Sequence, residues 1–269
     1  MSDSLATSER DRTLRLQKAR DIQQNLLPHN VEIPGVNIAI TYKPAEEVGG
    51  DYLDILPLSN DRWLVCVADA TGHGVPAAMS AAMLKTLLLQ ASERLVSPAE
   101  ILCEMNRIFM QVHIFGDFAS VILLTIDLDK QNINYANAGH DPAWLIDGYG
   151  NPRELTATGT LLGIDEDATW EEETIKLTAN CRLAVSTDGI TETFGPDDSM
   201  FSKSRLLEAL LCYQNQSLAD TNAHARKMVD THRSTGEQTD DVTLLLMEFL
   251  FEDCAVGSAP SIHREMTRR

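Results

Sequence analysis

The chain has 269 residues, of which 43% are hydrophobic, so it can bury the core of one large domain or two modest ones. Its 22 Lys and Arg residues stand against 40 Asp and Glu residues, which gives a formal charge of −18. This balance argues against nucleic acid and anionic membranes as partners, because binding to polyanions depends on clustered Lys and Arg.

The five cysteines are widely spaced and form no CxxC pair, which argues against a disulfide framework or a zinc knuckle. Core thiols in a reducing compartment are the better interpretation. The N-terminus has no apolar stretch of signal-peptide length, and no run approaches the roughly 18 apolar residues that span a bilayer. We therefore expect a soluble, cytoplasmic protein.

The first expected element is a polar helix over residues 8–27, rich in Arg, Gln and Glu, with a narrow apolar stripe and a stop at Pro28. Such a helix cannot form a core by itself. It either packs on the following domain, pairs with a second copy of itself, or is a frayed extension. We take residues 1–30 as a regulatory or dimerisation helix, through which the chain would form a homodimer.

Two groups of strands follow, and each is succeeded by a pair of helices. The first strands are expected at 36–44, 51–58 and 62–70, before helices over 75–95 and from Ser97, a residue suited to cap the second helix. The second group is expected at 118–128, 132–139, 142–147, 173–177 and 181–189, before helices over 204–214 and 218–234 and a buried strand within 240–251. Strands bunched in this way predict an α+β layered sandwich rather than alternating βαβ units. Residues 252–269 lack apolar periodicity and are expected to form a flexible tail.

Four aspartates stand at strand ends bounded by turns: Asp51, Asp69, Asp188 and Asp240. Taken singly, each is either a turn former or a metal ligand. Asp69 and Asp188 follow apolar runs, so their side chains would leave buried strands at one edge of the core. An unpaired charge is costly there, and a cation would offset that cost.

Six motifs occur in the order ARDIQQNLLP, GGDYLD, DATGHGVPAA, NAGHDPA, STDGITE and TDDVTLLL, from about Ala19 to Leu246. This set closely resembles the metal-dependent PPM (PP2C-like) serine/threonine phosphatases, in the SpoIIE and RsbU branch of bacterial stress and sporulation regulators. The resemblance implies a PP2C-like αββα sandwich, with two packed antiparallel sheets flanked by helix pairs, as a phosphatase domain over residues 31–251. It also implies two Mn²⁺ or Mg²⁺ ions at one edge of the sandwich.

The resemblance also implies roles for individual residues. Asp69 would bridge both metals, and the backbone carbonyl of Ala70 would bind one of them. Asp188 and Asp240 would hold the other metal, while Asp51 would complete the shell of the first, directly or through water. An all-oxygen shell suits hard divalent cations, and a pair of such ions can present water as the nucleophile without a reactive Ser or Cys.

One departure from the family concerns the proton donor to the leaving group. Eukaryotic relatives place a His two residues after the bridging Asp, where this chain has Thr71. The nearest imidazole is His73, which is either a general acid, and then a catalytic residue with Asp51 and Asp69, or a structural part of the turn. His140 in NAGHDPA is likewise either a turn residue or a residue near the site.

A second departure concerns phosphate binding. Eukaryotic relatives keep an Arg just upstream of the first Asp, whereas Glu46 and Glu47 stand here and the closest base is Lys43. Phosphate binding would then depend mainly on the metals. Asp241 stands where relatives carry Asn or Asp in a role outside the metal shell.

The leading hypothesis is a hydrolase that acts on phosphoserine or phosphothreonine, with a phosphorylated STAS-domain anti-sigma-factor antagonist as its substrate. Activity would be gated through the N-terminal helix by an upstream regulatory protein or by dimerisation. Two alternatives remain at this stage. One is a catalytically silent phosphoprotein-binding module of the same fold, and the other is a two-metal phosphodiesterase, which the charge of −18 disfavours.

Overall fold

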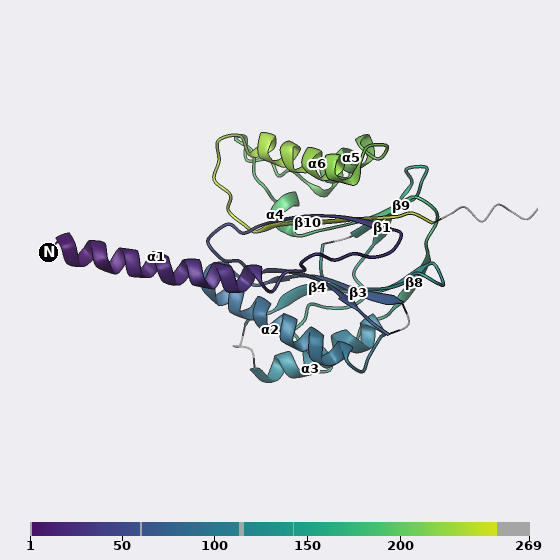
Figure 1. Ribbon diagram of the computed structural model, residues 1–269, viewed down its shortest axis with the longest axis horizontal. Helices are drawn as coiled ribbons and strands as arrows, with labels where there is room; N and C mark the ends of the chain where they lie inside the picture. Colours follow the sequence, from purple (N-terminus) through teal and green to yellow (C-terminus); the bar gives the residue numbers. More distant parts are fainter. Residues whose placement is uncertain (1, 60, 113–115, 142, 252–269) are drawn as a thin grey trace, which may run out of the picture.

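The strands form two sheets that pack face to face, with a helix pair on each outer surface (Figure 1). The computed structural model describes residues 2–59, 61–112, 116–141 and 143–251. Neighbouring strands of both sheets are antiparallel throughout. The α+β layered sandwich predicted from the sequence is confirmed.

Each sheet has five strands. The first has the order β1-β10-β9-β6-β7, with β1 (Val36–Lys43), β10 (Val242–Phe249), β9 (Cys181–Ser186), β6 (Ala143–Ile146) and β7 (Pro152–Leu155). The second has the order β2-β3-β4-β5-β8, with β2 (Asp51–Pro57), β3 (Arg62–Ala70), β4 (Ala119–Asp127), β5 (Asn132–Ala138) and β8 (Glu173–Lys176).

The helices complete the layers. On the second sheet lie α2 (Gly74–Ser92) and α3 (Pro98–Val112), and on the first lie α5 (Lys203–Cys212) and α6 (Leu218–Arg233). The Ser97 hydroxyl accepts a hydrogen bond of 3.3 Å from the Glu100 amide at the start of α3, as a capping residue should. A single helical turn, α4 (Asp188–Thr191), follows β9, and α1 (Ser2–Gln24) extends away from the sandwich (Figure 1).

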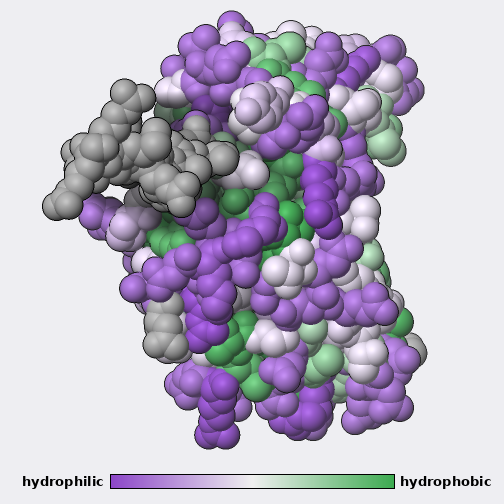
Figure 2. Space-filling model, turned by 90° about the vertical axis from the view of Figure 1, so that its right-hand side faces the viewer, coloured by the Kyte–Doolittle hydropathy of each residue, from purple (hydrophilic) through white to green (hydrophobic). Residues whose placement is uncertain are grey.

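Strand β3 shows how the sequence produces the layers. Its residues alternate, so Leu64, Cys66 and Ala68 pack against α2 and α3, while Val65 and Val67 face the other sheet. Both faces are covered, which explains why the strand reads as a nearly continuous apolar run. On the side of the molecule opposite α1, hydrophilic residues cover most of the surface, and apolar residues show in patches in the middle and toward the lower and upper ends (Figure 2).

Three details differ from the sequence predictions. The first helix ends at Gln24 rather than Leu27, because the chain turns before Pro28. Strand β7 and helix α4 were not predicted, since a four-residue element is too short to show a period and β7 begins with Pro152. Cys66 and Cys181 are core thiols, but Cys212 is exposed, so the prediction is wrong there. The predicted tail over 252–269 lies outside the described residues.

The described helices include none that is both long and apolar enough to cross a membrane.

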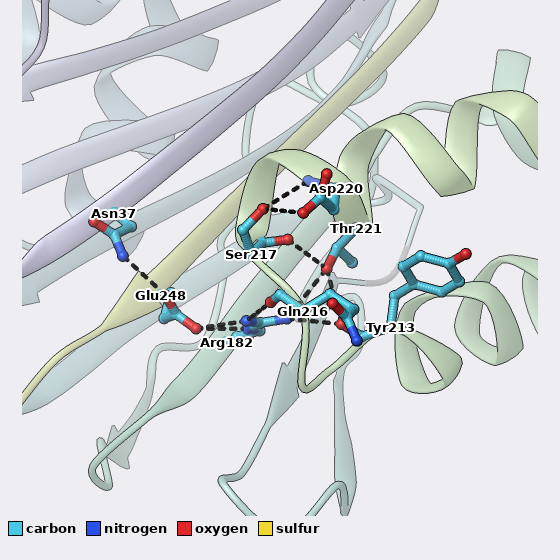
Figure 3. A network of polar contacts seen from close by, with 8 residues as sticks. All are labelled: Asn37, Arg182, Tyr213, Gln216, Ser217, Asp220, Thr221 and Glu248. Carbon is cyan, nitrogen blue, oxygen red and sulfur yellow. Dashed lines mark hydrogen bonds and ion pairs between the residues drawn. The ribbon is translucent and has the colours of Figure 1, made fainter.

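A polar network connects the α5–α6 loop and the start of α6 to the inner strands β9 and β10 of the first sheet (Figure 3). At its centre, the Arg182 guanidinium donates to Glu248 Oε1 at 2.6 Å, to the Gln216 carbonyl at 2.7 Å and to Thr221 Oγ1 at 3.2 Å. Only 12% of the Arg182 side chain and 15% of the Glu248 side chain are exposed, so water cannot replace these contacts. The guanidinium therefore donates hydrogen bonds both to the sheet, at Glu248, and to the helix layer, at Gln216 and Thr221.

We expect Arg182→Ala to lower the free energy of unfolding by about 3 kcal/mol, because the substitution leaves Glu248 Oε1, the Gln216 carbonyl and Thr221 Oγ1 without the Arg182 donor in a poorly solvated place. Urea unfolding followed by circular dichroism measures the change. Arg153→Ala is the matched control, because Arg153 of β7 also pairs with a glutamate, Glu173 of β8, but half of each side chain is exposed. Equal losses in the two variants would contradict the role assigned to the network.

Candidate functional site

The pairing of β2 with β3 brings the first two acidic motif residues together. Asp51 begins β2, Asp69 lies near the end of β3, and the antiparallel register places them directly opposite each other. Side chains of such a pair lie on the same face of the sheet, with Cβ atoms about 5 Å apart. Asp51 of the GGDYLD motif and Asp69 of the DATGHG motif are separated in the sequence, and they thus lie at the same edge of this sheet.

The other sheet reaches the same place through two threonines. Thr187, which precedes Asp188, donates its hydroxyl to Asp51 Oδ2 at 2.8 Å, and Thr243 donates to the same oxygen at 2.6 Å. Asp51 is 2% exposed, so this carboxylate is a buried link between the two sheets. Its Oδ1 atom accepts no hydrogen bond from any described residue and is free to bind a cation.

Asp241 holds the loop that carries Asp51. Its Oδ1 accepts from the Ala45 amide at 2.7 Å, and its Oδ2 accepts from the Gly50 amide at 2.6 Å. A Cβ atom at Gly49 would lie 2.0 Å from the Asp241 carboxylate, and one at Gly50 would lie 2.6 Å from the Ala70 carbonyl oxygen. The two glycines are therefore required for close approach. Both carboxylate oxygens of Asp241 thus accept hydrogen bonds from backbone amides.

The negative charge of each carboxylate raises the pKa of a neighbouring carboxylate in the site. Burial and then the Asp69 charge raise the pKa of Asp51 well above its ordinary value. Burial and then the Asp188 charge raise the pKa of Asp69 to about 8, and burial and then the Asp240 charge raise the pKa of Asp188 to about 6. Burial also raises the pKa of Asp240. Without a cation, the site concentrates negative charge that water screens poorly.

A cavity of about 180 Å³ opens at this edge. Three of its lining residues are acids, Asp69, Asp141 and Asp188, and the rest of the wall comes from Thr71, Phe118, Ser120, Gly139, His140 and Leu161. Asp141 was missed by the sequence analysis, although it lies within the quoted NAGHDPA motif. Thr187 and Thr243 were missed as well, because a hydroxyl beside an acidic motif residue gives no signal of its own.

The donor chemistry fits hard divalent cations. Asp51, Asp69, Asp188 and Asp240 supply carboxylate oxygens that form no ion pair with a Lys or Arg of the described residues, and the Ala70 carbonyl lies beside Gly50 in the same loop cluster. In the described part of the chain, no three His, Cys, Asp or Glu side chains already form a group that could hold a metal. Binding would therefore draw these side chains inward, as expected where like charges repel before a cation arrives.

The two histidines singled out in the sequence lie in different surroundings. His73 precedes α2 and pairs with Glu46 at 2.7 Å, and 71% of its side chain is exposed. His140 is buried, and its Nδ1 lies 2.7 Å from Ser120 Oγ. Asn137 fixes the turn by accepting from the His140 amide at 2.8 Å, so His140 is a turn residue that also lines the cavity.

Comparison with known proteins gives a family match and several relatives. The model of the stage II sporulation protein E family (SpoIIE) matches residues 59–250. Protein IcfG of Synechocystis is 26% identical over 262 residues, which cover 86% of this chain and 41% of that protein. The phosphoserine phosphatase RsbP of Bacillus subtilis is 26% identical over 237 residues, which cover 87% of this chain and 57% of that protein. The chain thus spans about half the length of these curated relatives.

Two solved structures show the same fold. The SiaA-PP2C domain of Pseudomonas aeruginosa superposes with a TM-score of 0.82 at 22% identity, covering 92% of this chain and all of that one. The catalytic domain of the serine/threonine phosphatase PstP, solved with two manganese ions, superposes with a TM-score of 0.60 at 13% identity, covering 80% and 99%. The PP2C-like form of the predicted sandwich is therefore confirmed.

We expect Asp69→Asn to raise the melting temperature of the metal-free protein at pH 7 by about 3 °C, which is about 1 kcal/mol for a domain of this size. The pKa of Asp69 is raised to about 8, so the folded protein must take up a proton that the unfolded chain does not hold, and the neutral amide removes this cost. Mn²⁺ should stabilise the wild type and stabilise the variant much less. Scanning calorimetry in EDTA and in Mn²⁺ measures both effects. A wild type that is indifferent to Mn²⁺ would rule out the metal centre.

Proposed function

Because this chain belongs to the SpoIIE family, whose solved relatives have the PP2C fold, we propose that it is a metal-dependent protein serine/threonine phosphatase. The observation that carries the proposal is that Asp51, Asp69, Asp188 and Asp240, from both sheets, lie close enough to raise one another's pKa, and that Asp69 and Asp188 line a cavity with no Lys or Arg among its lining residues. Phosphoryl groups and divalent cations are complementary to such a site.

The proposed metal centre uses these carboxylate oxygens and one carbonyl oxygen as ligands. Asp69 and the Ala70 carbonyl would contact one Mn²⁺ or Mg²⁺ ion, Asp51 would complete its shell, and Asp188 and Asp240 would hold a second ion with Asp69. When bound, two such ions supply an activated water and offset the charge of the phosphoryl group. The solved PstP domain holds two manganese ions in the same fold, which supports this number.

Several residues of the chain would prepare the site, and one would donate a proton to the leaving group. Thr187 and Thr243 hold Asp51 Oδ2, so the rotation of this carboxylate is fixed and Oδ1 is presented. Asp241 holds the Gly50 amide and so fixes the loop before Asp51. His73 lies near enough to Asp240 for their charges to interact, and we assign it the role of proton donor. Its pairing with Glu46 orients the ring.

The proposed substrate is a phosphoserine or phosphothreonine of a regulatory protein, specifically a phosphorylated STAS-domain antagonist of an anti-sigma factor. Two points support it. The relative RsbP is named a phosphoserine phosphatase, and the sequence motifs resemble the branch that acts on such antagonists. We assign catalysis to residues 31–251 and regulation to the helix within residues 1–30, in response to an upstream protein or to dimerisation.

The N-terminal helix makes direct contact with the loop that carries Asp51. Gln23 is buried, and its side chain donates to the Gly49 carbonyl at 2.6 Å and accepts from the Gly49 amide at 3.0 Å. Lys85 of α2 donates to the Leu26 carbonyl, just after the helix, at 2.7 Å. Movement of α1 would therefore pull on the backbone two residues before Asp51, which supports gating through this helix.

We expect purified protein to hydrolyse para-nitrophenyl phosphate and a phosphoserine protein only when Mn²⁺ or Mg²⁺ is present. Asp69→Asn should lower kcat/KM by more than about 100-fold, beyond the loss typical of residues outside a metal shell. Asp127→Asn, at the opposite end of the same sheet, is the control and should retain activity. A wild type that binds phosphoprotein without turnover would instead indicate a silent binding module.

Gln23→Ala should lower kcat by about tenfold, because the loop before Asp51 loses both hydrogen bonds that Gln23 makes. Gln24→Ala is the matched control, since the neighbouring side chain is exposed. Steady-state kinetics with saturating Mn²⁺ compares the two. Equal activity in both variants would remove the contact between α1 and the loop from the mechanism.

A further inference from the structure

The cavity that contains Asp69 and Asp188 has no Lys or Arg among its lining residues. Phosphate monoesters are dianions near neutral pH, and proteins usually bind them with charged donors as well as metals. The position where eukaryotic relatives carry an Arg holds Glu46, which is paired with His73. A cation for the phosphoryl group must therefore come from another element of the fold.

Lys203 is placed to provide that cation. Its Nζ lies 2.9 Å from Oδ1 of Asp141, which lines the cavity, and Thr191 donates to the other Asp141 oxygen at 2.9 Å. Of the ion pairs in the described part of the chain, this one alone involves a residue that lines the cavity. The first residue of α5 thus brings a positive charge to the rim.

The ammonium is also free to move. The Lys203 side chain is 48% exposed, whereas the side chain of its partner Asp141 is 20% exposed. An ion pair with one end in solvent is weak, and the lysine stem has four rotatable carbons. The ammonium can therefore exchange Asp141 for a phosphoryl oxygen at small cost, while Asp141 keeps its hydrogen bond from Thr191.

The charge balance favours this exchange. Six carboxylates influence one another at this edge: Asp51, Asp69, Asp141, Asp188, Asp240 and Asp241. Two divalent cations would leave a formal charge of −2 among them, which would repel an incoming phosphate dianion. A nearby ammonium reduces that repulsion and offers hydrogen bonds that strengthen where water is scarce.

We propose that Lys203 binds the phosphoryl oxygens of the substrate at the mouth of the cavity, and that Asp141 holds its ammonium there between turnovers. This inference rests on the proposed phosphatase function. It assigns phosphate recognition, in this chain, to the start of α5 rather than to the segment before β2.

The test compares Lys203→Met with Lys203→Arg and with Lys130→Met. Lys130 also pairs with an aspartate, Asp127, at 2.8 Å, but at the far end of the same sheet as Asp69. Lys203→Met should raise KM for a phosphoserine protein about tenfold with a smaller change in kcat, and should raise the Kd for inorganic phosphate about tenfold by calorimetry in Mn²⁺. Lys203→Arg should restore most of both values, and Lys130→Met should change neither.

Unchanged KM and unchanged phosphate affinity in Lys203→Met would overturn the assignment, and so would an equal loss in Lys130→Met. If the wild type hydrolyses no phosphoester, the proposed function fails. The calorimetric comparison then still decides the role of Lys203, because phosphate binding needs no turnover. Thermal melts should show equal stability for Lys203→Met and wild type, which separates weakened binding from a folding defect.

Discussion

Like charges lie together at one edge of the sandwich, and the loops and hydroxyl groups around them are arranged to hold these carboxylates in place. Both sheets contribute carboxylates to this edge, and each carboxylate raises the pKa of a neighbouring one. The fold compensates with neutral donors: two threonine hydroxyls hold Asp51, and backbone amides hold Asp241. These donors fix the carboxylates without neutralising them. The negative charge that remains can bind a divalent cation, and the bound cation can then bind a phosphoryl group.

The same contacts connect the site to elements that lie far from it. Three contacts hold the loop before β2. Asp241, which precedes β10 of the other sheet, and Gln23 of α1 both form hydrogen bonds with it, and the Ala70 carbonyl lies close to Gly50. A loop with so many fixed neighbours has little room to adjust alone. A displacement of α1 therefore changes the position of a site residue, which is the physical basis for regulation by an N-terminal partner or by a second copy of the chain.

Much of the fold was predictable because it depends on periodicity and on the order of elements. Strand β3 alternates between two buried faces, so its apolar run signalled a covered strand, and the helix pairs followed from their composition. Asp51 and Asp69 were predictable as a pair from their motifs. Thr187 and Asp141 were not, since their roles depend on cross-sheet geometry that no local pattern encodes. The role of Lys203 depends on how α5 returns to the cavity, and only the tertiary structure gives that.

Diffraction from crystals soaked in Mn²⁺, recorded at the manganese absorption edge, shows whether these aspartates share metal ions. Two anomalous peaks are expected at the sheet edge, between Asp69 and its acidic neighbours Asp51, Asp188 and Asp240, with the side chains drawn inward relative to the metal-free form. Peaks confined to other surfaces, or aspartates that stay apart in saturating Mn²⁺, would contradict the proposed metal centre.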